Sequence, residues 1–247
     1  MKNIKVALFD LGNTLLYFDA DFNEIVSQSF QVLARHLVSG GIPIDPLQFT
    51  RLFEERMTQN QVDRDVDLVE NSAESLLQNL LIELGIPFAP DGLLRHALNA
   101  MFAVTEAHWI LEPDAVETLE KLQHAGVRLG IITNAMDSND VNILIDQNDL
   151  RRHFEQIVIS GDEGIRKPHP EIFQKALDFF NVEPSRAVMV GDTLQADILG
   201  ANKMGIHSLW ITRRVQTPDR MLMNSSIEPT LTVGSLSEIP GLILPRV

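Results

Sequence analysis

The sequence predicts an α/β protein, a doubly wound parallel sheet with an all-helical block inserted after the first strand. Two observations carry this prediction. Short apolar runs recur along most of the 247 residues and alternate with amphipathic stretches of helical spacing. Between residues 18 and 107 the alternation stops and only helical patterns occur. Repeated strand–helix–strand units favour parallel pairing with right-handed crossovers, and therefore helices on both faces of one sheet.

Five apolar runs are predicted to be strands buried on both faces of the sheet. They have the length and the Val, Ile and Leu content of such strands. In chain order they are 5–10 (KVALFD), 127–133 (VRLGIIT), 155–160 (EQIVIS), 186–192 (RAVMVGD) and 206–212 (IHSLWIT). Amphipathic helices are expected at 113–125 and 169–180, and the tail after Ser225 is expected to add a short strand and a helix to the sheet edge.

The interval without strands predicts four successive helices. Their patterns cover 22–39, 46–59, 68–84 and 90–106, and Gly- and Pro-rich stretches separate them. A helical block inserted after the first strand indicates a small cap domain, residues 19–106, over the active edge of a core made of residues 1–18 and 107–247. The alternative is one continuous α/β domain with an extended helical face.

Composition limits the classes of partner. The 34 acidic and 20 basic residues give a net charge of −14, which argues against nucleic acid or an anionic membrane as partner. The absence of cysteine excludes disulfides, thiolate nucleophiles and cysteine metal sites. The apolar run before Asp10 is too short for a signal peptide, and no segment has the length of a membrane span. We expect a cytoplasmic monomer or homodimer.

Polar residues follow four of the predicted strands or lie just beyond them. They are Asp10 and Thr14, Thr133 and Asn134, Lys167 in GIRKPHPEIF, and Asp192 and Asp197 in GDTLQAD. The carboxyl ends of parallel strands meet at one edge, where open α/β sheets bind their ligands. Each residue taken singly is better explained as a turn or capping residue. The set is a candidate active site.

These residue types in this order suit phosphoryl transfer. Asp10 can attack phosphorus, and Asp10 with Asp192 can hold Mg²⁺, which prefers one or two carboxylates together with water and phosphate oxygens. Lys167 supplies a second positive charge. Thr133 and Asn134 can donate hydrogen bonds to the phosphoryl oxygens. The sequence therefore predicts a small phosphorylated metabolite as substrate and Mg²⁺ as cofactor.

The four motifs resemble those of the haloacid dehalogenase (HAD) superfamily. DLGNT contains the position of the nucleophile, Asp10; IITN contains Thr133; RKPHPEIF contains Lys167; and GDTLQAD contains the acidic pair. The resemblance covers the core and implies a Rossmann-like sheet with a helical cap between the first and second motifs.

The resemblance also implies specific roles. An aspartyl-phosphate would form on Asp10 and be hydrolysed by water. Mg²⁺ would be bound by Asp10, Asp192 and the backbone carbonyl of Gly12. Asp197 would lie in the outer shell of the metal or pair with Lys167.

Gly12 departs from the family's pattern. Most phosphatases of the family carry a second aspartate at this position, which protonates the leaving oxygen and later activates water. Glycine keeps the carbonyl but cannot carry a proton. General acid–base help is worth roughly 10²–10⁴-fold, so its loss should slow the turnover of substrates with poor leaving groups.

Three hypotheses stay open at this point. In the first, the protein is a phosphatase in which another acid, such as Asp19, Asp21 or a cap side chain, supplies the proton, or whose substrates have good leaving groups, as acyl phosphates do. In the second, it is a 2-haloacid dehalogenase; such enzymes use no Mg²⁺ and typically carry an aromatic residue in place of Gly12. In the third, it is a catalytically weak phosphate-binding or regulatory protein.

Other features are expected to be structural. His169 is predicted to begin a helix, Trp109 to be a packed aromatic side chain where the chain returns to the core, and 221–223 to lie in a surface helix.

Overall fold

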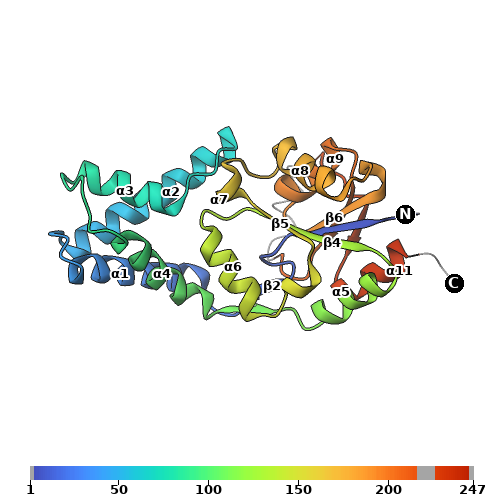
Figure 1. The fold of residues 1–247 in the computed structure, drawn as a ribbon, viewed down its shortest axis with the longest axis horizontal. Helices are drawn as coiled ribbons and strands as arrows, with labels where there is room; N and C mark the ends of the chain where they lie inside the picture. Colours follow the sequence, from blue (N-terminus) through green and yellow to red (C-terminus); the bar gives the residue numbers. More distant parts are fainter. Residues whose placement is uncertain (1–2, 216–225, 245–247) are drawn as a thin grey trace.

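A six-stranded parallel sheet forms the centre of the computed structural model, which describes residues 3–215 and 226–244. The strand order is β5-β4-β1-β6-β7-β8. Figure 1 shows the sheet among its flanking helices. The strands are β1 (Val6–Phe9), β4 (Arg128–Thr133), β5 (Gln156–Ile159), β6 (Ala187–Gly191), β7 (His207–Ile211) and β8 (Leu231–Val233). The predicted doubly wound α/β class is confirmed, and so is the short edge strand of the tail. Residues 221–223 lie outside the described residues.

Helices cover both faces of the sheet, and the alternation of side chains in β1 shows how. Ala7 and Phe9 pack into one apolar cluster, to which α5 (Ala115–His124), α6 (Ser138–Gln147) and α11 (Ile239–Ile243) contribute. Val6 and Leu8 pack into a second cluster with α8 (Pro170–Phe180) and α9 (Leu199–Lys203). Because both faces are buried, the strand is continuously apolar, as its sequence suggested.

The interval between β1 and β4 contains a separate group of helices, which lies beside the sheet in Figure 1. These are α1 (Phe22–Ser39), α2 (Pro46–Asp67), α3 (Ala73–Glu83) and α4 (Leu93–Glu106). They share an apolar cluster of their own, whose large members include Phe30, Phe49, Phe53, Leu77 and Leu98. The four helices were predicted, whereas the division into a core and a cap at residues 19–106 stays a prediction.

Three of these helices differ from the predicted ranges, and α4 begins at Leu93 rather than at residue 90. α2 continues to Asp67 rather than ending at residue 59. Its last turns could not be predicted from an apolar stripe, because Val62 and Val66 are exposed. Leu68, in the left-handed conformation, ends α2, and the Ser72 side chain caps α3. The residues between them, 68–72, are therefore a connection rather than the first turn of a helix.

Two short strands join the helical block to the sheet. β2 (Leu16–Phe18) and β3 (Trp109–Leu111) pair antiparallel, with Phe18 opposite Trp109. With three residues each, they are too short to give a periodic signal. They hold together the two segments along which the chain enters and leaves the helical block.

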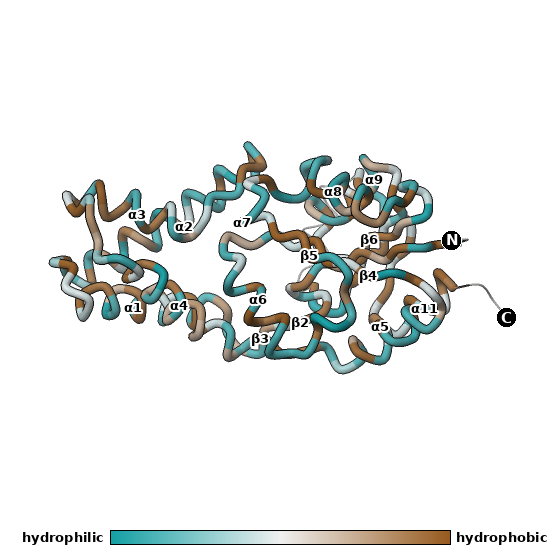
Figure 2. The backbone as a smooth tube through the Cα atoms, viewed as in Figure 1, coloured by the Kyte–Doolittle hydropathy of each residue, from teal (hydrophilic) through white to brown (hydrophobic). Residues whose placement is uncertain are grey.

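Hydrophobic residues concentrate in the strands of the sheet, whereas polar and apolar residues alternate along the helices (Figure 2). Within residues 3–215 and 226–244, no helix has both the length and the apolar character needed to cross a bilayer. The strands that end at the candidate active site are almost entirely buried.

Candidate active site

Three carboxylates from different segments meet at the carboxyl edge of the sheet. Asp10 follows β1, Asp192 follows β6, and Asp197 lies one turn further on, in the short π-helical segment Leu194–Ile198. One oxygen of each lies within 4.8 Å of one oxygen of the others. The structure thus brings together the three acids that the sequence singled out.

Lys167 occupies the centre of this acidic group. Its Nζ donates to Asp10 Oδ1 at 2.7 Å, to Asp197 Oδ1 at 2.6 Å and to the Ile132 carbonyl at 2.6 Å. The side chain is almost fully buried, so all three ammonium protons have protein acceptors. Lys167 therefore fixes the position of the Asp10 carboxylate, and Asp197 takes the second of its two predicted places, the pair with Lys167.

Asp197 is also tied to the loop after β6. Its Oδ2 accepts the backbone N–H of Thr193 at 3.0 Å, so both of its oxygens have donors. A Cβ on Gly191 would lie 2.3 Å from this carboxyl group, which explains why glycine precedes Asp192. This role of Gly191 was not predicted from the sequence, although the pair that it forms with Asp192 in GDTLQAD could have indicated it.

The charges of the cluster do not cancel. Three ionised carboxylates and one ammonium leave a formal charge of −2 in a buried site. Burial and the Asp197 charge raise the pKa of Asp10 to about 6, against the opposing effect of Lys167. Burial, together with the charges of Asp10 and Asp197, raises the pKa of Asp192 to about 7. Burial alone would lower the pKa of Lys167, but Asp10 and Asp197 raise it above its usual value.

The donor set of this cluster fits a hard divalent cation. All three candidate side chains offer carboxylate oxygen, the ligand type that Mg²⁺ and Ca²⁺ prefer, and the chain has no cysteine. A charge of +2 would also cancel the excess negative charge of the cluster. Asp10 and Asp192 are the better candidate ligands, because both oxygens of Asp197 already accept hydrogen bonds.

The second motif lies against Lys167. The Asn134 side chain accepts the Lys167 N–H at 2.8 Å and donates to the Lys167 carbonyl at 3.0 Å. This amide therefore positions the lysine, and its contact with a phosphate stays a prediction. Thr133 ends β4 with a buried side chain. The Thr14 hydroxyl is buried and makes no hydrogen bond with the described residues.

Gly12 lies against Trp109. A Cβ built on Gly12 would be 3.3 Å from the Trp109 ring, and the Gly12 φ lies outside the left-handed region that favours glycine. The indole is itself packed edge-on against Phe18, with ring centroids 5.2 Å apart. The space beside Gly12 is therefore limited by an aromatic side chain rather than by backbone strain.

The other predicted features have structural partners. Asp21 caps α1 by accepting the Glu24 N–H at 3.0 Å, and Asp19 Oδ1 lies 3.0 Å from His108 Nδ1. His169 caps α8, as predicted. Of the two acids that could replace the missing acid at Gly12, Asp21 is therefore already engaged in capping α1.

Comparison with known proteins agrees with this geometry. Residues 4–205 match the family model of haloacid dehalogenase-like hydrolases. A glyceraldehyde 3-phosphate phosphatase of Pyrococcus furiosus is 30% identical over 217 residues, which cover 85% of this chain and 81% of the relative.

Solved structures share the fold. A HAD phosphatase from Thermococcus onnurineus superimposes with a TM-score of 0.63 at 23% identity and covers 97% of both chains. A 2-haloacid dehalogenase from Pseudomonas syringae superimposes with a TM-score of 0.66 at 23% identity, over 96% of this chain and 97% of its own. Because phosphatase and dehalogenase superimpose equally well, the choice between the two reactions depends on the site.

Proposed function

This chain belongs to the haloacid dehalogenase-like hydrolase family, and we propose that it is a Mg²⁺-dependent phosphatase that acts on a small phosphorylated metabolite through Asp10. The observation that carries this proposal is the buried acidic cluster with Lys167 at its centre and a formal charge of −2. We further propose that residues 19–106 form a cap domain over this edge of the sheet.

Asp10 is the proposed nucleophile. Its carboxylate attacks phosphorus, the bond between phosphorus and the leaving oxygen breaks, and the phosphoryl group is carried on Asp10. Water then attacks the same phosphorus, the bond to the Asp10 oxygen breaks, and inorganic phosphate leaves. Lys167, 2.7 Å from Asp10 Oδ1, holds the carboxylate in place and offsets the charge of an approaching phosphate. The Thr133 hydroxyl would donate to a phosphoryl oxygen.

Asp10, Asp192 and the Gly12 carbonyl are the groups that would hold Mg²⁺. When bound, the ion would cancel the negative charge that otherwise keeps a phosphate dianion out of the site. Asp197 contributes by fixing Lys167 and the Thr193 loop. The retained acids disfavour a dehalogenase, whose chemistry needs no cation at this place.

The absence of an acid at Gly12 limits the substrate class. With Asp21 used as a helix cap and Asp19 paired with His108, we propose that the preferred substrates have good leaving groups, such as acyl phosphates, and that simple alkyl esters react slowly.

A kinetic survey tests the proposed function. We expect Mg²⁺-dependent hydrolysis of p-nitrophenyl phosphate and acetyl phosphate, and loss of both activities in Asp10→Asn. Tight binding of a phosphate compound without turnover would support a regulatory protein instead. Release of chloride from 2-chloropropionate without metal would support a dehalogenase.

Substitution of Gly12 tests the missing acid. We expect Gly12→Asp alone to gain little on alkyl phosphates, because the new side chain meets the Trp109 ring. Combining it with Trp109→Leu should raise the alkyl phosphate rate by about tenfold or more, the lower part of the range for general acid catalysis. Trp109→Leu alone is the matched control. An unchanged rate in the double variant would show that another group already supplies the proton.

A further inference from the structure

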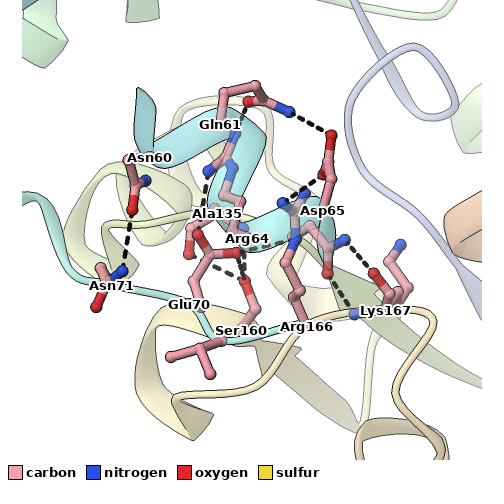
Figure 3. Close-up of polar contacts among 12 residues, drawn as sticks. Asn60, Gln61, Arg64, Asp65, Glu70, Asn71, Ala135, Ser160, Arg166 and Lys167 are labelled. Atoms are coloured by element: carbon pink, nitrogen blue, oxygen red, sulfur yellow. Dashed lines mark hydrogen bonds and ion pairs between the residues drawn. The ribbon is translucent and has the colours of Figure 1, made fainter. Parts of the chain in front are cut away.

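A second polar cluster, with a buried carboxylate at its centre, lies next to Lys167 (Figure 3). It joins the end of α2 and the α2–α3 connection to two loops of the sheet. Its charged and hydroxyl members, here called the Glu70 cluster, are Arg64, Asp65, Glu70, Ser160 and Arg166. None of these residues was singled out by the sequence.

Glu70 is the centre of this cluster. Its side chain is fully buried, and its two oxygens accept from Arg64 Nη1 at 3.1 Å and from the Ser160 hydroxyl at 2.8 Å. Arg166 Nε lies 3.5 Å from the same carboxylate, and Arg166 Nη1 donates to Asp65 at 2.9 Å. Two acids and two arginines therefore balance one another.

The backbone around Glu70 is paired with the sheet loops as well. The Glu70 N–H donates to the Gly164 carbonyl at 3.0 Å, and the Arg166 N–H donates to the Leu68 carbonyl at 3.1 Å. These two bonds flank an antiparallel bridge between Val69 and Ile165. The helical block is thus attached to the sheet here, in addition to its attachment through β2 and β3.

The segment that receives this attachment, residues 160–166, precedes Lys167 directly and also contacts the loop that follows Thr133 and Asn134. Arg166 is the residue before Lys167. Ser160 accepts the N–H of Ala135 at 2.8 Å, and Ala135 follows the Thr133–Asn134 pair. The Asn134 side chain in turn binds the backbone of Lys167 on both sides. A continuous set of hydrogen bonds therefore runs from Glu70 to the lysine and to the predicted phosphate-binding loop.

The two loops also approach each other closely. A Cβ on Gly161 would lie 2.8 Å from the Ala135 carbonyl, so a small movement of either loop displaces the other. Removing the Glu70 charge would leave Arg64 and Arg166 without the anion that they share inside this contact. The loops that hold Lys167 would then lose their support from the helical block.

We infer that Glu70 is a positioning residue, which couples docking of the α2–α3 connection to the placement of Lys167 and of the Thr133–Asn134 loop. In this arrangement the docked helical block is part of the working active site. The consequence for catalysis rests on the proposed function, whereas the docking itself does not.

The first experiment removes the charge and keeps the shape. We expect Glu70→Gln to lower kcat for acetyl phosphate by about 10- to 100-fold, the size of effect that follows from a misplaced catalytic group, with little change in KM. Glu83→Gln is the matched control, because it removes the acid of an exposed ion pair with Arg56 in the same helical block. An unchanged kcat in Glu70→Gln overturns the proposal.

The second experiment restores docking without Glu70. Val69 and Ile165 are partners of a non-hydrogen-bonded antiparallel pair, whose Cα atoms are typically about 4.5 Å apart, within the span of a disulfide. The chain has no cysteine, so V69C/I165C gives one defined disulfide. In the oxidised V69C/I165C background, we expect the effect of Glu70→Gln on kcat to fall below about twofold, while the reduced protein keeps the full effect.

Two results would contradict this coupling. If oxidation fails to restore kcat in the Glu70→Gln protein, Glu70 does not act through docking. If oxidation abolishes turnover when Glu70 is intact, the docked arrangement is not the working one.

Hydrogen exchange separates this proposal from the proposed function. In Glu70→Gln we expect faster amide exchange at 68–73, 134–136 and 160–166, and unchanged exchange at β1 and within α1. This measurement needs no substrate, so it decides on docking even if the protein hydrolyses no phosphate. Uniformly faster exchange across the chain would show a general loss of stability and overturn the positioning role.

Discussion

Two charged clusters lie close to each other, one around Lys167 and one around Glu70, and they differ in their balance of charge. The acidic cluster of Asp10, Asp192, Asp197 and Lys167 has three acids for one base. The Glu70 cluster has two acids and two bases. The first raises the pKa values of its own acids, whereas the second satisfies its carboxylate completely.

This difference indicates separate roles for the two clusters, ligand binding for the acidic cluster and structural support for the Glu70 cluster. Buried charges persist in folded proteins when they are paired, and an unpaired excess favours protonation or the binding of a counter-ion. The charge of the acidic cluster therefore favours the binding of a cation, whereas the Glu70 carboxylate has its partners without any ligand. The same change, acid to amide, should consequently have opposite effects on stability in the two places.

The largest effect is expected in the balanced cluster. Glu70→Gln should lower the free energy of unfolding by about 3–5 kcal/mol, because it removes the buried anion that is paired with Arg64 and Arg166. Glu83→Gln, at an exposed pair, should cost less than about 1 kcal/mol. Urea unfolding of both variants measures the difference. Equal, small effects would show that the Glu70 cluster is not a tightly balanced unit.

At Asp192, by contrast, the change from acid to amide is expected to increase the free energy of unfolding. Its pKa rises from 3.8 to about 7 on folding, so the folded protein binds this proton more tightly, and the associated stability is lost as the pH rises through about 7. An amide cannot ionise. Asp192→Asn should therefore stabilise the metal-free protein at about pH 8, by on the order of 2–4 kcal/mol. If urea unfolding shows that Asp192→Asn is less stable than the unmodified protein, the acidic cluster does not carry a destabilising excess of negative charge.

Added Mg²⁺ should remove this penalty in the native protein. At about pH 8 and a concentration near 100 times Kd, the ion should stabilise the fold by about 2.7 kcal/mol. Protonation of Asp10 and Asp192, with pKa values of about 6 and 7, competes with the ion, so the gain in Tm should vanish near pH 5. Thermal unfolding with and without Mg²⁺ across this range checks both statements; a pH-independent gain would place the ion elsewhere.

A smaller effect is expected where two acids meet without a lysine. Burial, followed by the charge of Glu106, raises the pKa of Asp140 to about 8, so its carboxyl group is mostly neutral at pH 7. The stability associated with this proton is lost as the pH rises through 8. Asp140→Asn should therefore raise stability at both pH 6 and pH 9, and by more at pH 9, because the cost of keeping Asp140 grows by about 1.4 kcal/mol per pH unit between its unfolded and folded pKa values. Equal unfolding curves at both pH values would show that Asp140 is not neutral in the native protein.

Most of the candidate site could be predicted from the sequence because Asp10, Asn134 and Asp192 each follow a recognisable strand. Phe9, Thr133 and Gly191 end runs that are buried on both faces, and parallel pairing brings their ends together. The pairing of Asp197 with Lys167 was one of two arrangements the sequence left open. The role of Asn134 in holding Lys167 could not be read from spacing, because its partner lies 33 residues away.

The Glu70 cluster could not be predicted for a related reason. Glu70 and its partner Ser160 are 90 residues apart, and the patterns that predicted a helix over 68–84 and a strand over 155–160 do not indicate that these two side chains meet. The end of α2 was missed because Val62 and Val66 face solvent, although this extension brings Arg64 to Glu70. The end of α2 has tertiary contacts but no apolar stripe, so a periodic pattern could not predict it.

The most direct test of Asp10 as a phosphoryl carrier is a trapped intermediate. The protein is mixed with Mg²⁺ and acetyl phosphate, quenched in acid during turnover, and mapped by peptide mass spectrometry. We expect one phosphoryl group on the peptide that contains Asp10, and none in Asp10→Asn or when Mg²⁺ is omitted. Steady release of phosphate with no label on Asp10, or with the label on another residue, would contradict the proposed chemistry.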